Sequence, residues 1–64
     1  MTVNGEEKVL QQPISLKDYL LSENYNLAHI AVELNDEIIK KTDYDNVMLD
    51  NKSRLEIVHF LGGG

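Results

Sequence analysis

The sequence predicts a two-layer α+β domain, in which a single helix covers one face of a small β-sheet. Only the stretch from Ser15 to Glu23 has apolar residues at helical spacing, whereas the later apolar stretches alternate or are rich in β-branched residues. The chain has 64 residues, which is enough for one small domain. It has no cysteine, so this fold depends on packing alone and holds no disulfide or thiolate zinc site.

Composition and charge exclude several functional classes. Six Lys and Arg residues stand against eleven Asp and Glu residues, so the net charge is −5. This balance argues against binding to nucleic acid or to anionic membranes, since both need a basic surface. No apolar stretch approaches the roughly 20 residues of a spanning helix, and we expect a cytoplasmic protein. A chain this short does not enclose a deep active site, so we do not expect an enzyme.

The first element is predicted to be an antiparallel hairpin formed by residues 1–4 and 8–12. Asn4-Gly5 lies between these segments, and this dipeptide readily adopts the positive φ angles of a tight hairpin turn. Pro13 has no amide hydrogen to donate to a sheet, so it is expected to end the second strand.

The helix is predicted to begin after Ser15, whose hydroxyl can accept a hydrogen bond from a free backbone amide of the first turn. Asp18, three residues later, approximates a capping box. Asn24 and Asn26 are suitable residues for leaving the helix. The residues that fall on one side of this helix are Leu16, Tyr19, Leu20 and Glu23.

Three further strands are expected in the second half of the chain. Residues 28–34 alternate and place Ile30, Val32 and Leu34 on one face. A turn at Asn35-Asp36 leads to a brief strand at 37–39. Residues 40–46 are polar and irregular, with room for one short helical turn, and residues 47–49 return to the core.

The last strand is predicted at residues 54–60, after a turn at 50–53. Leu55 and Ile57 fall on one face of this strand and are expected in the core. Val58 and Phe60 fall on the opposite face, where they are expected to form an exposed apolar docking patch.

The glycines are concentrated at one end of the chain. Of four glycines, three are the last three residues, 62–64. One interpretation is an inert flexible end, since chain termini tolerate almost any sequence. The other is that the terminal carboxylate of Gly64 is the reacting group, because residues without a Cβ can pass extended through a narrow channel. From Leu61 to Gly64 an extended chain spans about 13–14 Å.

Three segments of the chain together resemble a known family. They are Asn4-Gly5-Glu6, residues 30–35 (Ile-Ala-Val-Glu-Leu-Asn) and residues 55–64, in which a strand runs directly into the glycines. These segments resemble the ThiS family, the sulfur carriers of thiamine biosynthesis within the ubiquitin-like β-grasp superfamily. The resemblance covers essentially the whole chain.

Two segments depart from the usual pattern of that family. The chain has Lys40-Lys41 where family members usually have a Pro-Arg or similar pair. It has Asp50-Asn51-Lys52-Ser53 where they usually have a turn with a glycine. Without that glycine, Asn51 is the residue expected to take a left-handed conformation.

The resemblance implies a ubiquitin-like β-grasp domain over residues 1–60, with a small mixed sheet packed on one helix, and a flexible glycine tail at 61–64. It implies that a separate, Mg-dependent E1-like adenylyltransferase (ThiF-type) adenylates the carboxylate of Gly64 with ATP. Sulfur from a cysteine desulfurase or other persulfide donor then converts this group to a thiocarboxylate. A thiazole synthase (ThiG-type) accepts the sulfur.

In this scheme the carrier itself contributes no catalytic side chain, no metal and no cofactor. Gly62 and Gly63 form the tail that leads to the reacting group. The residues expected to bind the partner enzyme are Val58, Phe60 and Leu61.

Two kinds of alternative stay open from the sequence. The first is a sulfur carrier of another pathway, similar to the small subunit of molybdopterin synthase or to a modifier that thiolates tRNA. Those relatives are generally longer, so the length favours the thiamine branch. The second is a β-grasp interaction module whose glycines do not react.

Overall fold

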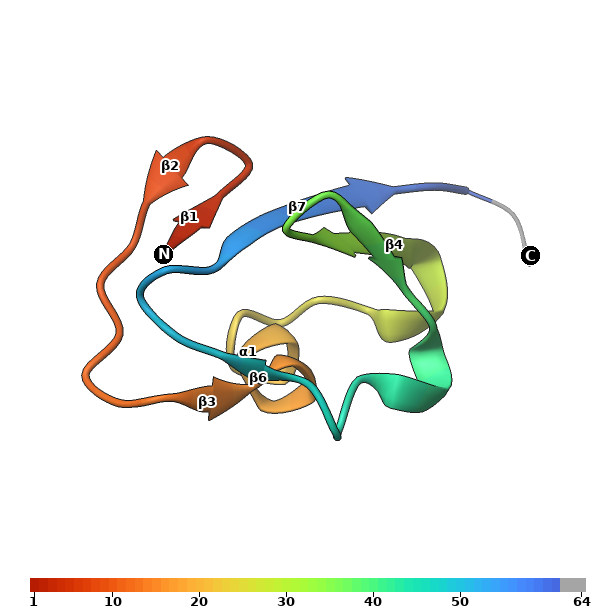
Figure 1. Ribbon diagram of the computed structural model, residues 1–64. Coiled ribbons are helices and arrows are strands. Elements are labelled where there is room, and N and C mark those ends of the chain that lie inside the picture. The colour runs from red at the N-terminus through yellow and green to blue at the C-terminus, as the bar shows by residue number, and fades with distance from the viewer. Residues whose placement is uncertain (62–64) are drawn as a thin grey trace.

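The computed structural model describes residues 1–61 and contains a five-stranded mixed sheet packed on one helix (Figure 1). The order of strands in this sheet is β2-β1-β7-β4-β5, with β1 and β7 parallel and the other pairs antiparallel. A second sheet contains β3 and β6. This arrangement confirms the predicted fold class. The strands are β1 (Thr2–Val3), β2 (Glu6–Glu7), β3 (Ile14–Ser15), β4 (Ile30–Leu34), β5 (Glu37–Ile39), β6 (Met48–Leu49) and β7 (Arg54–His59).

The first hairpin forms where the sequence predicts its turn, but its second strand lies elsewhere. Asn4 and Gly5 have φ angles of 51° and 83°, as a two-residue hairpin turn requires. This short turn brings Glu6 directly opposite Val3, so β2 is Glu6–Glu7. The prediction of a strand at residues 8–12 is therefore wrong. Pro13 ends no strand and instead precedes β3, which the sequence analysis did not predict.

The helix α1 (Leu16–Ser22) begins and ends as its sequence predicts. The amide of Asp18 donates a hydrogen bond of 3.1 Å to the hydroxyl of Ser15, which is the N-cap. Asn24 ends the helical segment with a φ of 63°. The buried side chains of α1 are those of Leu16, Tyr19 and Leu20.

Strands β5, β4 and β7 pair as an antiparallel unit. β4 pairs with β5 through a turn at Asn35 and Asp36, whose φ angles are 51° and 71°. β4 begins at Ile30 rather than at residue 28, because a short 3-10 turn, η1 (Leu27–His29), precedes it. The side chain of Asn26 caps this turn by accepting a hydrogen bond of 3.0 Å from the amide of Ala28.

The core lies between α1 and the sheet. Its side chains come from the inward face of each strand and from α1, and they are Met1, Val3, Leu16, Tyr19, Leu20, Ile30, Val32, Tyr44, Leu49, Leu55 and Ile57. Tyr44 reaches this core from a polar segment, directly after the 3-10 turn η2 (Lys41–Asp43). Burial raises the pKa of the Tyr44 phenol.

The turn at residues 50–53 closes without a left-handed residue, so the expectation for Asn51 is wrong. Asn51 is not among the residues with a positive φ. Hydrogen bonds between Asp50 and Ser53 close the turn instead, from the Ser53 amide to the Asp50 carbonyl (3.1 Å) and from the Asp50 amide to the Ser53 hydroxyl (3.0 Å). The side chain of Asn51 binds both backbone groups of Leu10, at 2.8 and 3.0 Å.

Within residues 1–61, no helix has the length and apolar character to cross a membrane.

Candidate functional site

The outward face of the sheet, opposite α1, carries exposed apolar side chains. Val58 of β7 and Ala31 of β4 are direct cross-strand partners, and Ile38 lies on the neighbouring strand β5. Val58 is 60% exposed and Ile38 is 77% exposed. We call Ala31, Ile38 and Val58 the apolar patch. An exposed group of this kind on a small acidic domain is typical of a surface that binds another protein.

The apolar patch surrounds a shallow depression of about 230 Å³. This volume is below the ~300–1,000 Å³ of ordinary small-molecule pockets, so it suits a single protein side chain better than a free ligand. The lining residues are Ala31, Val32, Glu33, Ile38, Glu56 and Val58. The sequence analysis did not identify Ala31 or Ile38 as site residues. Ala31 alternates with the buried Ile30 and Val32, which places it on this face, whereas Ile38 follows the exposed Glu37 and carries no such signal.

The chain leaves the sheet at Phe60. Its amide donates a hydrogen bond of 2.9 Å to the carbonyl of His29. Its ring is half-buried, and the ammonium nitrogen of Lys41 lies 5.6 Å from the ring centroid, within the range of a cation–π contact. Leu61 follows and is 99% exposed. The end of β7 therefore presents apolar side chains at the point where the chain departs from the domain.

The predicted partner-binding residues Val58, Phe60 and Leu61 thus lie within four positions at the end of β7. Val58 and Leu61 are exposed, and Phe60 is partly covered from the side of Lys41. The predicted tail residues Gly62 and Gly63 and the predicted reacting residue Gly64 lie outside the described residues.

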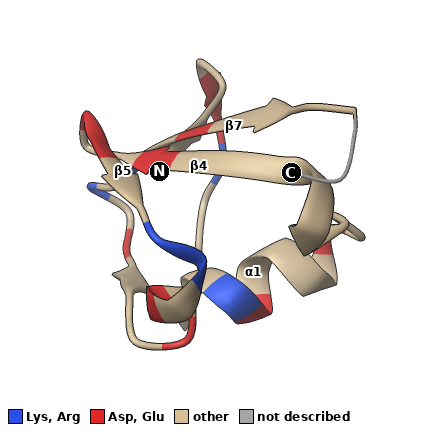
Figure 2. Cartoon of the chain, turned by 90° about the vertical axis from the view of Figure 1, so that its right-hand side faces the viewer, with Lys and Arg blue, Asp and Glu red and all other residues tan. Residues whose placement is uncertain are grey.

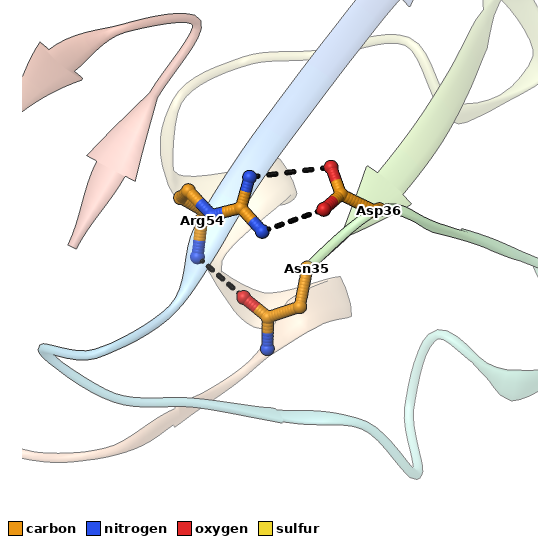
Figure 3. Close-up of polar contacts among 3 residues, drawn as sticks. All are labelled: Asn35, Asp36 and Arg54. Atoms are coloured by element: carbon orange, nitrogen blue, oxygen red, sulfur yellow. Dashed lines mark hydrogen bonds and ion pairs between the residues drawn. The ribbon is translucent and has the colours of Figure 1, made fainter.

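Charges beside the apolar patch are mostly negative. Strands β4 and β7 each contain one acidic residue, Glu33 and Glu56. Figure 2 shows in red the acidic residues of the whole described chain. Arg54, the cation of β7, donates two hydrogen bonds to the carboxylate of Asp36, at 3.2 and 2.8 Å (Figure 3). These bonds and the charge of Arg54 lower the pKa of the Asp36 carboxyl below its usual value of 3.8. Both side chains are exposed, so the pair contributes little to stability.

A second depression, on the side of the first hairpin, is polar and its groups are largely engaged within the domain. The side chain of Asn4 binds both backbone groups of Ile57, at 3.2 and 2.7 Å. Glu6 pairs with Lys8 at 3.6 Å. Nearby, the rings of Tyr25 and His59 stack with centroids 5.4 Å apart. These contacts join the hairpin and the end of α1 to β7, which indicates a structural role. The lining residues are Val3, Asn4, Glu6, Lys8, Tyr19, Glu23 and Tyr25.

A protein family, a curated relative and a solved structure each match this chain over nearly its whole length. Residues 1–64 match the ThiS family. The chain is 37% identical to the sulfur carrier protein ThiS of Bacillus subtilis, with 100% of this chain and 98% of that protein covered. It superposes on the crystal structure of the thiamine biosynthesis protein ThiS from Geobacter metallireducens with a TM-score of 0.83 and 26% identity, covering 98% and 96% of the two chains.

A similar segment also occurs inside a larger enzyme. The chain is 34% identical to part of the thiazole synthase of Paramagnetospirillum magneticum; all of this chain aligns, but only 20% of that protein. A domain like this one is thus joined to a thiazole synthase within a single polypeptide.

Proposed function

The chain belongs to the ThiS family of sulfur carriers of thiamine biosynthesis, and we propose that it carries sulfur as a thiocarboxylate on Gly64. The observation that carries this proposal is the end of β7. There, a strand anchored in the sheet leads through the fully exposed Leu61 directly into the glycine sequence. The folded domain would orient the terminal carboxylate, and the chemistry would take place in the active sites of partner enzymes.

The proposed reaction begins with adenylation. An oxygen of the Gly64 carboxylate attacks the α-phosphate of ATP in an Mg-dependent, ThiF-type adenylyltransferase, and pyrophosphate leaves. The terminal sulfur of a donor's persulfide then attacks the acyl carbon, and AMP leaves. Two thiol groups of a reductant then supply two electrons and become a disulfide; this splits the acyl disulfide, leaves the thiocarboxylate on Gly64 and restores the donor thiol. The persulfide would come from a cysteine desulfurase or another donor.

The glycines suit this path for a steric reason. Without a Cβ, Gly62 and Gly63 can pass through a channel too narrow for other residues and can adopt backbone angles that those residues avoid. An extended chain from Leu61 to Gly64 reaches about 13–14 Å, which suffices to bring the carboxylate from the domain surface to ATP inside the partner.

The carrier itself would not be an enzyme, because no side chain of its own takes part in these steps. We place its activity in the cytoplasm, where the ATP that it needs is available. The acceptor of the sulfur would be a thiazole synthase. The presence of a similar domain within the thiazole synthase of Paramagnetospirillum magneticum supports this pairing.

The adenylyltransferase would bind the apolar patch together with the residues at the end of β7. Val58 belongs to both groups, so the two surfaces are continuous. Phe60 and Leu61 extend the contact toward the reacting end. This placement lets one docking event bind the domain and direct the tail.

Intact-mass spectrometry tests the proposal. The purified chain is incubated with ATP, a ThiF-type adenylyltransferase and a persulfide donor. The chain is expected to gain the mass difference between sulfur and oxygen, and a fragment ion should place that gain on Gly64. An unchanged mass with an intact Gly64 would contradict the proposal and would favour a non-reactive interaction module.

Replacing Phe60 with alanine should weaken binding to the adenylyltransferase by roughly 10–100-fold, as loss of an aromatic anchor does at other protein interfaces. The thermal midpoint of the domain should change little, because Phe60 is not among the half-buried side chains that pack against the core. Titration calorimetry and thermal unfolding measure the two effects. Val9→Ala is the control, since Val9 is 77% exposed and does not line the depression of the apolar patch. A stability loss of ~3 kcal/mol or more would contradict this account of Phe60.

A further inference from the structure

Two glutamates face each other across the middle of the sheet. Glu33 of β4 and Glu56 of β7 are direct partners in the antiparallel register. Side chains at such positions have Cβ atoms roughly 4.5–5.5 Å apart, and like charges there destabilise the sheet. Both side chains are exposed, so water screens this repulsion without removing it. The free domain therefore retains an unfavourable contact on its outward face.

Within the described part of the chain, neither Glu33 nor Glu56 takes part in an ion pair. Within residues 1–61, the ion pairs are Lys8 with Glu6 and Arg54 with Asp36. Arg54 is on the same strand as Glu56, but its guanidinium donates to both carboxylate oxygens of Asp36 (Figure 3). The backbone amide of Arg54 donates to the side-chain oxygen of Asn35. The cation nearest in sequence to Glu56 is thus directed to the β4–β5 turn.

The same two glutamates line the depression of the apolar patch. The floor and walls are mainly hydrocarbon, from Ala31, Ile38 and Val58, and the two glutamates stand beside it, with Glu33 directly opposite Ile38 on the neighbouring strand. Few groups match both surfaces at once. Arginine does, because its apolar stem packs on hydrocarbon while its planar guanidinium donates to carboxylates in two directions. The depression is also of a size for one long side chain.

We propose that this depression receives an arginine side chain of a partner protein, with its stem on the apolar patch and its guanidinium between Glu33 and Glu56. The argument for this occupant is charge complementarity. The face is acidic in a chain of net charge −5, and neither glutamate has an ion-pair partner within residues 1–61. The partner is the adenylyltransferase, so the inference rests on the proposed function and specifies the chemistry of its docking surface.

The inference predicts opposite effects on stability and on binding. Glu33→Gln and Glu56→Gln each relieve the repulsion, so each should raise the thermal midpoint of the free domain by roughly 1–4 °C at low salt. Each should also weaken binding to the adenylyltransferase by about 5–50-fold, as expected for loss of a charged partner in an interface. The loss should shrink as salt is raised, because the wild-type contact is screened.

Glu37→Gln is the matched control. It makes the same chemical change at another exposed glutamate, on β5, that does not line the depression. Its binding to the adenylyltransferase should equal that of the wild type. A purely structural role for Glu33 and Glu56 would change the thermal midpoint and leave binding unchanged.

The outcomes separate the two proposals. If the wild type binds and gains sulfur, and both glutamine variants bind as tightly as it does, the arginine site is wrong and the carrier function stands. An equal loss in Glu37→Gln would also overturn the site, because it would reflect net charge alone. If the binding loss disappears when Mg²⁺ is withheld, the pair holds a metal ion rather than an arginine. A wild type that neither binds the adenylyltransferase nor gains sulfur overturns both proposals.

Discussion

Deleting Gly63 and Gly64 is expected to abolish sulfur loading and to leave the folded domain intact. The deletion moves the terminal carboxylate back by two residues, or roughly 7 Å of extended chain. A misplacement of about 1 Å can already cost 10²-fold in rate, so a shift this large should remove detectable adenylation. The described core and sheet contain neither glycine, and terminal residues contribute little to stability.

Two measurements on the truncated chain check this expectation. Intact-mass spectrometry after incubation with ATP, the adenylyltransferase and the persulfide donor should show no sulfur gain. Thermal unfolding should coincide with that of the full chain, which serves as the control. A truncated chain that loads sulfur on Gly62 at the rate of the full chain would refute the proposed role of the tail.

Replacing Leu20 with alanine should destabilise the domain by about 2–5 kcal/mol, as at other buried leucines. Leu20 is completely buried on the inward side of α1, in the core that α1 shares with the sheet. A domain of this size has a total stability of roughly 3–10 kcal/mol, so the variant should lose a large fraction of it. Chemical denaturation measures the free energy of unfolding.

Leu21→Ala provides a matched control for this change. It removes the same atoms from the next residue of the same helix, but Leu21 is 50% exposed. Its effect should stay within about 0.5 kcal/mol, as for most surface substitutions. Equal losses at both positions would mean that α1 does not bury the side that the structure assigns to it.

The elements that could be predicted from the sequence carry a strong local signal. The hydroxyl of Ser15 caps α1. Positive φ angles occur at Asn4-Gly5 and at Asn35-Asp36, because glycine has no Cβ and the short polar side chains of Asn and Asp tolerate this conformation. Alternation placed Ile30, Val32, Leu55 and Ile57 in the core. In each case, neighbouring residues determine the outcome.

The elements that escaped prediction depend on contacts between distant segments. β3 and β6 have two residues each, too few for a periodic pattern, and they form because Ile14 meets Leu49 across the chain. Asn51 was expected to adopt a positive φ, but its side chain instead binds Leu10, 41 residues away.

The same distinction applies to the candidate site. The exposure of Val58 follows from alternation along β7, and it was predicted. The neighbours of Val58 depend on the register between β4 and β7, which sets Ala31 beside Val58 and Glu33 opposite Glu56. Sequence periodicity does not determine that register, so the apolar patch and the pair of glutamates emerge only from the structure.

The most direct test of the central claim uses a chain whose Gly64 carboxylate is replaced by a carboxamide. Such a chain can be made by semisynthesis and differs from the wild type at one terminal group. Transfer of labelled sulfur from the persulfide donor to a thiazole synthase is then measured for both chains, with ATP and the adenylyltransferase present. We expect the wild type to deliver sulfur and the amide to deliver none. Delivery by the amide at the rate of the wild type would contradict the account.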